Sequence, residues 1–236
     1  MKRAVWIILF FGFGVNLMFA ARPMITDDAR VVDEHSCQLE TWGQYSHQIG
    51  EFWAIAGCNF IYDVEISFGG LLSNEPTQAM SDHRAKWGGR ELVIGAKKVL
   101  KDLETDGYSF GLALGNAYNF RRLKNPNDFY LYVPISKAFF DNRLFVHANL
   151  GYKLEHNTSS EHIYNVGLGL EQEVSKRVWV LAETIYERLD TPKYQFGLRI
   201  WLMPDRIQLD GTYGNAFKGG QSWLSVGLRF LGPRMY

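Results

Sequence analysis

The stretch YQFGLRIWL at residues 194–202 alternates large apolar residues with small or polar ones. Gln195, Gly197 and Arg199 share one face of this stretch. The other face consists of Tyr194, Phe196, Leu198, Ile200 and Leu202. A period of two indicates a β-strand, because the 3.6-residue period of a helix would scatter both sets. The same pattern recurs at residues 108–115, 164–171 and 224–230. These stretches predict an all-β protein.

Twelve such runs, each ended by turn residues, are predicted after residue 36. They cover residues 37–47, 51–59, 63–73, 86–100, 107–118, 128–138, 143–154, 162–174, 177–187, 193–202, 205–213 and 221–231. The runs at 51–59 and 86–100 are the least regular, and part of 94–103 could form an amphipathic helical turn. Ten or eight strands are therefore alternatives. An even number is expected when both ends of a single-chain barrel lie on one side of a membrane.

Alternation alone leaves open which face meets water. The apolar faces turn inward in a soluble β-sandwich and face lipid in a membrane barrel. Two observations favour the barrel: short and long connections alternate, and glycines crowd the polar faces, where strands exposed to water would gain nothing from them. Those glycines are Gly69, Gly95, Gly111, Gly115, Gly151, Gly167, Gly169, Gly197 and Gly227. We predict a transmembrane antiparallel up-and-down β-barrel of about twelve strands, with a soluble periplasmic β-sandwich as the alternative.

The first 21 residues have the composition of a signal peptide. Lys2 and Arg3 precede an uncharged, mostly apolar stretch, and Ala20 and Ala21 supply small residues for cleavage. An uncleaved helical anchor is the alternative. Residues 22–36 are polar and without a clear period, so we expect a periplasmic N-terminal segment, followed by a barrel over residues 37–236. Export by this signal predicts a location in the bacterial outer membrane, with its lipid as a partner.

Composition excludes several classes of function. Lys plus Arg equals Asp plus Glu at 25 each, so no basic surface points to nucleic acid. The sequence contains no HExxH, GxSxG or phosphate-binding glycine loop. An outer-membrane phospholipase would need a serine and a histidine together on the lipid face, and His147 points inward by phase. We therefore assign no catalytic residue, metal ion or cofactor and expect no enzyme; the oligomeric state is left open.

Charged and imidazole side chains on the polar faces are the candidate lumen-lining residues. They are Glu40, Glu65, Glu91, Lys97, His147, Lys153, Glu171, Glu173, Arg199, Asp210 and Arg229. In a pore such charges line the water path and bias selectivity. The alternative is internal ion pairing that fills a narrow barrel. Cys37 and Cys58 lie on consecutive predicted strands at similar distances from the turn between them, so they are a candidate disulfide.

The start of the mature chain resembles a known group of barrels. Residues 22–29 read RPMITDDA and residues 37–41 read CQLET. They are similar to bacterial outer-membrane β-barrel proteins with an RPxxTDDA-type N-terminus, related to the MetA-type transporters associated with the phenol-degradation meta-pathway. The resemblance implies an outer-membrane barrel with a role in small-molecule passage, and it implies no catalytic residues.

These observations lead to a channel or transporter for small solutes as the first functional hypothesis. The alternative is a non-conducting barrel that acts structurally or binds a partner at the cell surface. Its contact loops would be residues 73–85 and 120–127, and the second of these contains the basic cluster Arg121, Arg122 and Lys124.

Overall fold

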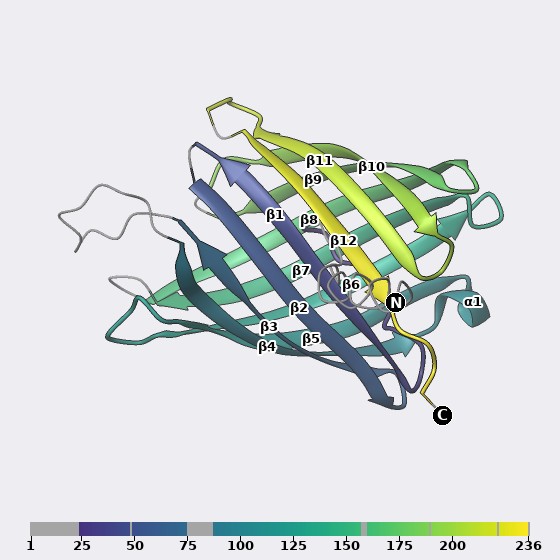
Figure 1. Cartoon of the computed structure of the whole chain (residues 1–236), viewed down its shortest axis with the longest axis horizontal. Coiled ribbons are helices and arrows are strands. Elements are labelled where there is room, and N and C mark those ends of the chain that lie inside the picture. The colour runs from purple at the N-terminus through teal and green to yellow at the C-terminus, as the bar shows by residue number, and fades with distance from the viewer. Residues whose placement is uncertain are drawn as a thin grey trace, which may run out of the picture.

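A computed structural model describes residues 24–47, 49–74, 87–156, 160–188, 190–220 and 222–235. Its strands form a closed antiparallel barrel in which each strand pairs with its neighbours in sequence and β1 pairs with β12 (Figure 1). Closure leaves no unpaired edge, which a barrel in lipid requires because no water can satisfy exposed backbone groups there. The prediction of an up-and-down barrel of about twelve strands is confirmed, and the alternative of a β-sandwich is wrong.

All twelve predicted strands are present, each ending within three residues of its expected range. They are β1 (Ser36–Ser46), β2 (Ile49–Ile61), β3 (Val64–Ser73), β4 (Gly88–Lys101), β5 (Tyr108–Asn119), β6 (Asn127–Phe139), β7 (Leu144–His156), β8 (Ser160–Ser175), β9 (Val178–Glu187), β10 (Lys193–Met203), β11 (Ile207–Ala216) and β12 (Trp223–Leu231). A single helical turn, α1 (Leu103–Asp106), interrupts the β4–β5 connection. Among the described residues, no helix is both long enough and apolar enough to cross a membrane.

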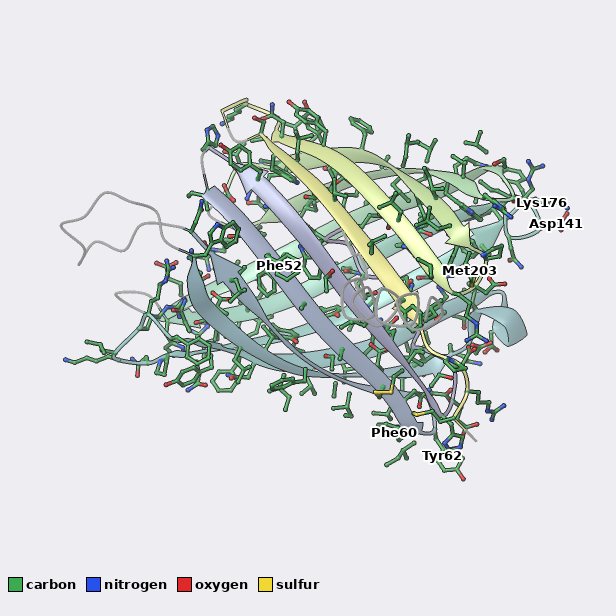
Figure 2. The ribbon with its side chains drawn as sticks, viewed as in Figure 1. Phe52, Phe60, Tyr62, Asp141, Lys176 and Met203 are labelled. Carbon is green, nitrogen blue, oxygen red and sulfur yellow. A yellow bond between two sulfur atoms is a disulfide. The ribbon has the colours of Figure 1, made fainter. Side chains whose placement is uncertain are left out.

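The connections at the two ends of the barrel differ in length. One end, which we call the turn end, carries the connections 62–63, 102–107, 140–143, 176–177 and 204–206. Figure 2 labels Tyr62, Asp141 and Lys176 at this end. The opposite, loop end carries the connections 47–48, 74–87, 120–126, 157–159, 188–192 and 217–222. The connection expected at 155–161 is shorter than predicted, because β7 and β8 continue pairing as far as His156 and Ser160.

Side-chain exposure shows which face of the barrel is apolar. On β10, Leu198 is 52% exposed, whereas Gln195 is 1% exposed. On β12, Val226 is 61% exposed and Ser225 is 2% exposed. Leucines, valines and phenylalanines therefore cover the outside, and polar side chains fill the inside. This arrangement is inverted relative to a water-soluble protein and suits a barrel surrounded by lipid.

A disulfide joins the first two strands near the turn end. Cys37 of β1 lies opposite Cys58 of β2, and their sulfur atoms are bonded (Figure 2). The cross-strand position is the one expected from the equal spacing of the two cysteines around the β1–β2 connection. The bond fixes the first hairpin of the barrel in register, and β1 is the strand that must close against β12.

The polar segment before β1 lies inside the barrel. The described part of this segment, residues 24–35, forms hydrogen bonds with inward-facing side chains of seven strands. This position differs from the periplasmic location expected for residues 22–36. A polar stretch without a period suits a polar lumen as well as it suits water, so composition could not distinguish the two. The predicted signal peptide, residues 1–21, lies outside the described residues.

Candidate functional site: a lumen occupied by the N-terminal segment

Residues 24–32, here called the lumen segment, pass through the barrel without regular secondary structure. Met24, Asp27, Ala29 and Val32 are each at most 6% exposed, although none of them belongs to a strand. An irregular segment can be buried this deeply only when its backbone groups find partners other than water. The lumen wall supplies those partners as side chains.

The part of the lumen segment deepest in the barrel is held by β9 and β7. The Glu183 carboxylate of β9 accepts hydrogen bonds from the backbone N–H groups of Ile25 (2.8 Å) and Thr26 (2.7 Å). Asn149 of β7 makes a reciprocal pair with Asp27: its Oδ1 accepts from the Asp27 N–H (2.7 Å), and its Nδ2 donates to the Asp27 carbonyl (2.8 Å). The Asn149 amide thus takes the place that a neighbouring strand would occupy in a sheet.

The Asp27 side chain contacts other residues than the Asp27 backbone does. Lys97 Nζ of β4 lies 3.1 and 3.2 Å from the two carboxylate oxygens, and the Tyr132 hydroxyl of β6 donates to Oδ2 at 2.6 Å. The side chains of Lys97 and Asp27 are 8% and 5% exposed. A buried lysine needs an acidic partner, because removing a single charge from water costs several kcal/mol. Asp27 and Lys97 therefore stabilise each other's position.

Toward the turn end, the lumen segment is held by hydroxyl, amide and carboxylate groups. Ser136 Oγ of β6 accepts from the Ala29 N–H (2.8 Å), and the Ser109 hydroxyl of β5 donates to the Ala29 carbonyl. Glu65 of β3 accepts from the Val32 N–H (3.0 Å), and Asn59 Nδ2 of β2 donates to the Val32 carbonyl (2.9 Å). The segment therefore rises from the start of β1 at the turn end toward the middle of the barrel.

Two glycines of β8 provide the space that the lumen segment fills. A Cβ atom on Gly167 would lie 2.6 Å from Thr26 Oγ1, and one on Gly169 would lie 2.7 Å from Met24 Cε. Both distances are shorter than atoms tolerate without movement. The glycine-rich polar faces noted in the sequence thus reflect crowding inside the barrel, and here the crowding comes from the chain's own N-terminal segment.

All eleven predicted lumen-lining residues lie on the inward face of their strands. Seven are buried, namely Glu40, Glu65, Lys97, His147, Glu171, Arg199 and Asp210, and four are partly buried, namely Glu91, Lys153, Glu173 and Arg229. They do not converge on one site. Lys97, Glu65 and Glu171 contact the lumen segment, Glu171 through Arg30 at 4.0 Å. The others form ion pairs and hydrogen bonds at different heights along the wall.

The largest group surrounds Arg199 of β10. Its guanidinium lies 2.7 Å from a Glu171 oxygen and 3.0 Å from an Asp210 oxygen, and Gln208 also donates to Asp210 (2.8 Å). His147 lies 3.8 Å from Glu171 on the other side. An arginine that bridges two buried carboxylates satisfies charges that would otherwise be costly inside the barrel.

A second group links Arg229 to the lumen segment. Arg229 lies 3.4 Å from Glu40 and donates to Gln38 at 2.8 Å, and Gln38 in turn donates to Glu65 at 3.0 Å. Glu65 is the acceptor for the Val32 N–H. The side chains of β1 and β12 thereby help to position the carboxylate that holds the lower part of the segment.

The remaining predicted residues lie near the two ends. Lys153 pairs with Glu155 (3.0 Å), and Glu91 lies 3.9 Å from Arg90, both toward the loop end. Glu173 lies 3.6 Å from Arg143 at the turn end.

The basic cluster expected as a surface patch is divided by the structure. Arg122 folds inward and pairs with Asp128 at 2.6 Å, and Arg121 donates to the Ser73 carbonyl at 3.3 Å. Lys124 is exposed. Most of the other predicted contact loop, residues 75–85, lies outside the described residues. Two of the three basic side chains therefore contribute to loop structure.

Ser136, His147 and Glu171 form a serine–histidine–acid series inside the barrel, with Ser136 Oγ 2.8 Å from His147 Nδ1. A nucleophilic serine must be reachable by substrate. Ser136 is 0% exposed and already accepts the Ala29 N–H, so its geometry is that of a structural contact. Within the described part of the chain, no group of acidic, histidine or cysteine residues could hold a metal ion.

Open volume remains on both sides of the lumen segment. A cavity of about 420 Å³ toward the loop end has Ile25, Thr26 and Asp27 as its floor and Tyr130 and Lys153 among its walls. A cavity of about 550 Å³ at the turn end is lined by Arg30, Val32 and residues around Arg199 and Arg229. The lumen segment therefore lies between two open spaces, here called vestibules, one toward each end of the barrel.

Several residues that hold the lumen segment were not predicted. Glu183 is the clearest case, since its inward neighbours Leu181 and Ile185 are apolar and buried, which hides the polar face of β9. Asn149 shares the polar face with His147, but its role depends on a segment expected elsewhere. An isolated acid between two apolar residues of one strand face was the available signal for Glu183.

Comparisons with known proteins give a family and a fold. Residues 14–230 match the profile of a protein family described as "Uncharacterised conserved protein UCP029691". No curated protein matches the sequence.

Among solved structures, the "KdgM porin" is similar with a TM-score of 0.59 and 12% identity over 83% of this chain and 98% of that chain. The "COG4313 outer membrane channel from Pseudomonas putida F1" gives a TM-score of 0.65 and 10% identity over 88% and 99%. The "Outer membrane phospholipase A from Escherichia coli" gives 0.51 and 9% over 89% and 93%. At these identities the likeness shows the fold, which is that of outer-membrane barrels.

Proposed function

The chain belongs to the UCP029691 family, and on that premise we propose that it is an outer-membrane channel for small solutes whose passage is restricted by its own lumen segment. Residues 1–21 act as the export signal in this proposal. The turn end then faces the periplasm, where short connections are usual, and the loop end faces outward. The apolar outer surface described above matches the lipid that would surround such a barrel.

The observation that carries this proposal is the pair of vestibules on either side of the lumen segment. A barrel with a purely structural role gains stability by filling its interior with side chains, yet here about 420 and 550 Å³ remain open above and below one irregular segment. The segment is held by hydrogen bonds and by the ion pairs of Lys97 with Asp27 and Asp28 and of Arg30 with Glu171. Because these contacts are non-covalent and only the turn end of the segment continues into a strand, it can leave the lumen without breaking the barrel.

The likeness to porins supports the proposal at the level of fold. One similar structure carries the description "KdgM porin in complex with disordered oligogalacturonate", which concerns that protein's ligand. At 12% identity, this ligand does not transfer to the present chain. The RPxxTDDA-type resemblance adds an independent expectation of small-molecule passage, and the solute class is addressed in the next subsection.

The alternative is a non-conducting barrel. The dense ion pairing around Arg199 and the burial of the lumen segment favour it, since both narrow the water path. The two proposals differ in one measurable property. A gated channel must conduct when the lumen segment is loosened, and a structural barrel must not.

Planar-bilayer conductance distinguishes these cases. We expect infrequent openings from the full-length protein and more frequent openings from the double variant Asn149→Ala/Glu183→Ala, which removes four hydrogen bonds to the lumen segment. A heat-dependent shift on gels shows that each preparation is a folded barrel. Folded protein that gives no channels in either form would contradict the proposed function.

A further inference from the structure

The geometry of the lumen wall points to a binding track for extended peptides. We propose that the lumen segment is the resident occupant of this track and that a short peptide carrying a carboxylate side chain can take its place. The inference rests on the proposed function in one respect, because it names such peptides as the solute class of the channel. Binding itself can be measured without conductance.

The lumen wall binds the main chain of the lumen segment. Backbone N–H groups of residues 25, 26, 27, 29 and 32 donate to lumen side chains, and backbone carbonyls of residues 27, 28, 29 and 32 accept from them. These groups are common to every peptide. Extended peptides bound through their main chain gain affinity from such bonds and specificity from a few side-chain contacts. The partners lie on the inward faces of seven strands, β2 to β7 and β9, and are Asn59, Glu65, Lys97, Ser109, Ser136, Asn149 and Glu183.

The track also binds the Asp27 carboxylate of the lumen segment. Asp27 is the lumen-segment side chain with the closest charged contact to the wall, through Lys97 and Tyr132. Glu65 and Glu183 flank this cation along the track and accept from N–H groups of the lumen segment and from glutamines. A peptide with an acidic residue at the Lys97 position therefore fits, whereas a basic residue there would repel Lys97.

The barrel interior has space for a peptide along the track. Met24 and Thr26 occupy space left by Gly169 and Gly167, and the segment is contacted by open vestibules at both ends. A peptide that replaces the lumen segment therefore has a path to the track and room for side chains of moderate size. A polyol or sugar of similar length has hydroxyl donors, but it lacks the repeating N–H and C=O groups of a main chain, which here pair with side chains on seven strands.

In the intact protein the lumen segment occupies the track and is covalently attached to β1. A segment attached to β1 competes at a high effective concentration against any free peptide. The experiment must therefore release the segment from a barrel that has already folded around it. Insertion of a specific protease site between Asp33 and Glu34 allows this, since Asp33 is exposed at the turn end.

The probe is a fluorescent peptide with the sequence of residues 24–32, MITDDARVV. After cleavage and removal of the released fragment, we expect saturable binding by fluorescence anisotropy and no binding to the uncut protein. A matched peptide that is N-methylated at Thr26, Ala29 and Val32 keeps its charge and side chains but lacks three donors. We expect it to bind at least about 30-fold more weakly.

Two further peptides test whether the track binds the main chain and the Asp27 carboxylate. A peptide with alanine at positions 24, 25, 28, 30, 31 and 32 that keeps Thr26, Asp27 and Ala29 should bind within about tenfold of the native sequence, because it keeps the main chain and the carboxylate. The same peptide with Asp27 replaced by lysine should lose binding. Equal binding of the native and N-methylated peptides, or no binding of the native peptide to the cut barrel, would overturn the inference.

Failure of the inference and failure of the proposed function give different results. If the cut barrel conducts but binds no peptide, the track is refuted and the channel stands. If it binds peptide but never conducts, the track stands and the channel is refuted. Should the inserted site prevent folding, a variant lacking residues 24–32 replaces the cut protein in the same binding assay, and the same peptides decide the outcome.

Discussion

Replacement of Asn149 by alanine should release the lumen segment more often. The Asn149 amide makes two hydrogen bonds to the Asp27 backbone, one with the N–H group and one with the carbonyl. A hydrogen bond of this kind contributes about 1 kcal/mol net, so the loss of two lowers the free energy of segment release by about 2 kcal/mol. At 1.4 kcal/mol per tenfold change, the released population rises about 30-fold.

Trypsin cleavage after Arg30 measures that population. Residues around Arg30 lie inside the barrel, where a protease cannot reach them, so cleavage follows the released fraction when the segment returns faster than it is cut. Mass spectrometry identifies the N-terminal fragment that ends at Arg30. Asn165→Ala is the matched control, because Asn165 lines the same vestibule and makes no hydrogen bond to the described part of the segment. Cleavage of Asn149→Ala within about twofold of the unaltered protein, or an equal increase in the control, would refute the reasoning.

Three other substitutions test separate parts of the structure. Gly169→Val should displace the lumen segment and raise both trypsin cleavage and conductance, whereas Gly211→Val should not, because no atom lies closer than 4.0 Å to a Cβ on Gly211. Arg199→Met leaves two buried carboxylates without their arginine and should destabilise the barrel by about 3–5 kcal/mol in urea unfolding; Lys176→Met in an exposed turn should change little. Cys37→Ser opens a disulfide that spans 21 residues and should lower stability by up to about 3 kcal/mol, seen as a lower temperature for the gel shift; an unchanged temperature would show that barrel closure alone fixes β1.

The fold could be predicted from the sequence because the decisive signal is local. Alternation in stretches such as 194–202 fixes which side chains share a face, and that face assignment placed all eleven candidate lumen residues inside. The less regular run at 51–59 is a strand all the same, since β2 pairs along its length with β1 and β3. Backbone pairing with the two neighbouring strands therefore stabilises β2 as a strand although its alternation is poor.

The occupant of the lumen could not be predicted because its contacts are long-range. Asp27 meets Lys97 and Asn149 across 70 and 122 residues, and nothing near Asp27 in the sequence shows this. Polarity without a period is shared by water-exposed tails and by segments bound to polar walls. The internal ion pairing weighed against an open pore is present around Arg199.

Single-channel conductance before and after cleavage at the site inserted between Asp33 and Glu34 tests the central claim most directly. The same folded barrel is measured twice, and only the attachment of the lumen segment changes. We predict rare openings before cleavage and a sustained conductance once the released fragment has left. A folded barrel whose conductance is unchanged after the fragment has been lost would contradict the claim that the lumen segment closes a channel.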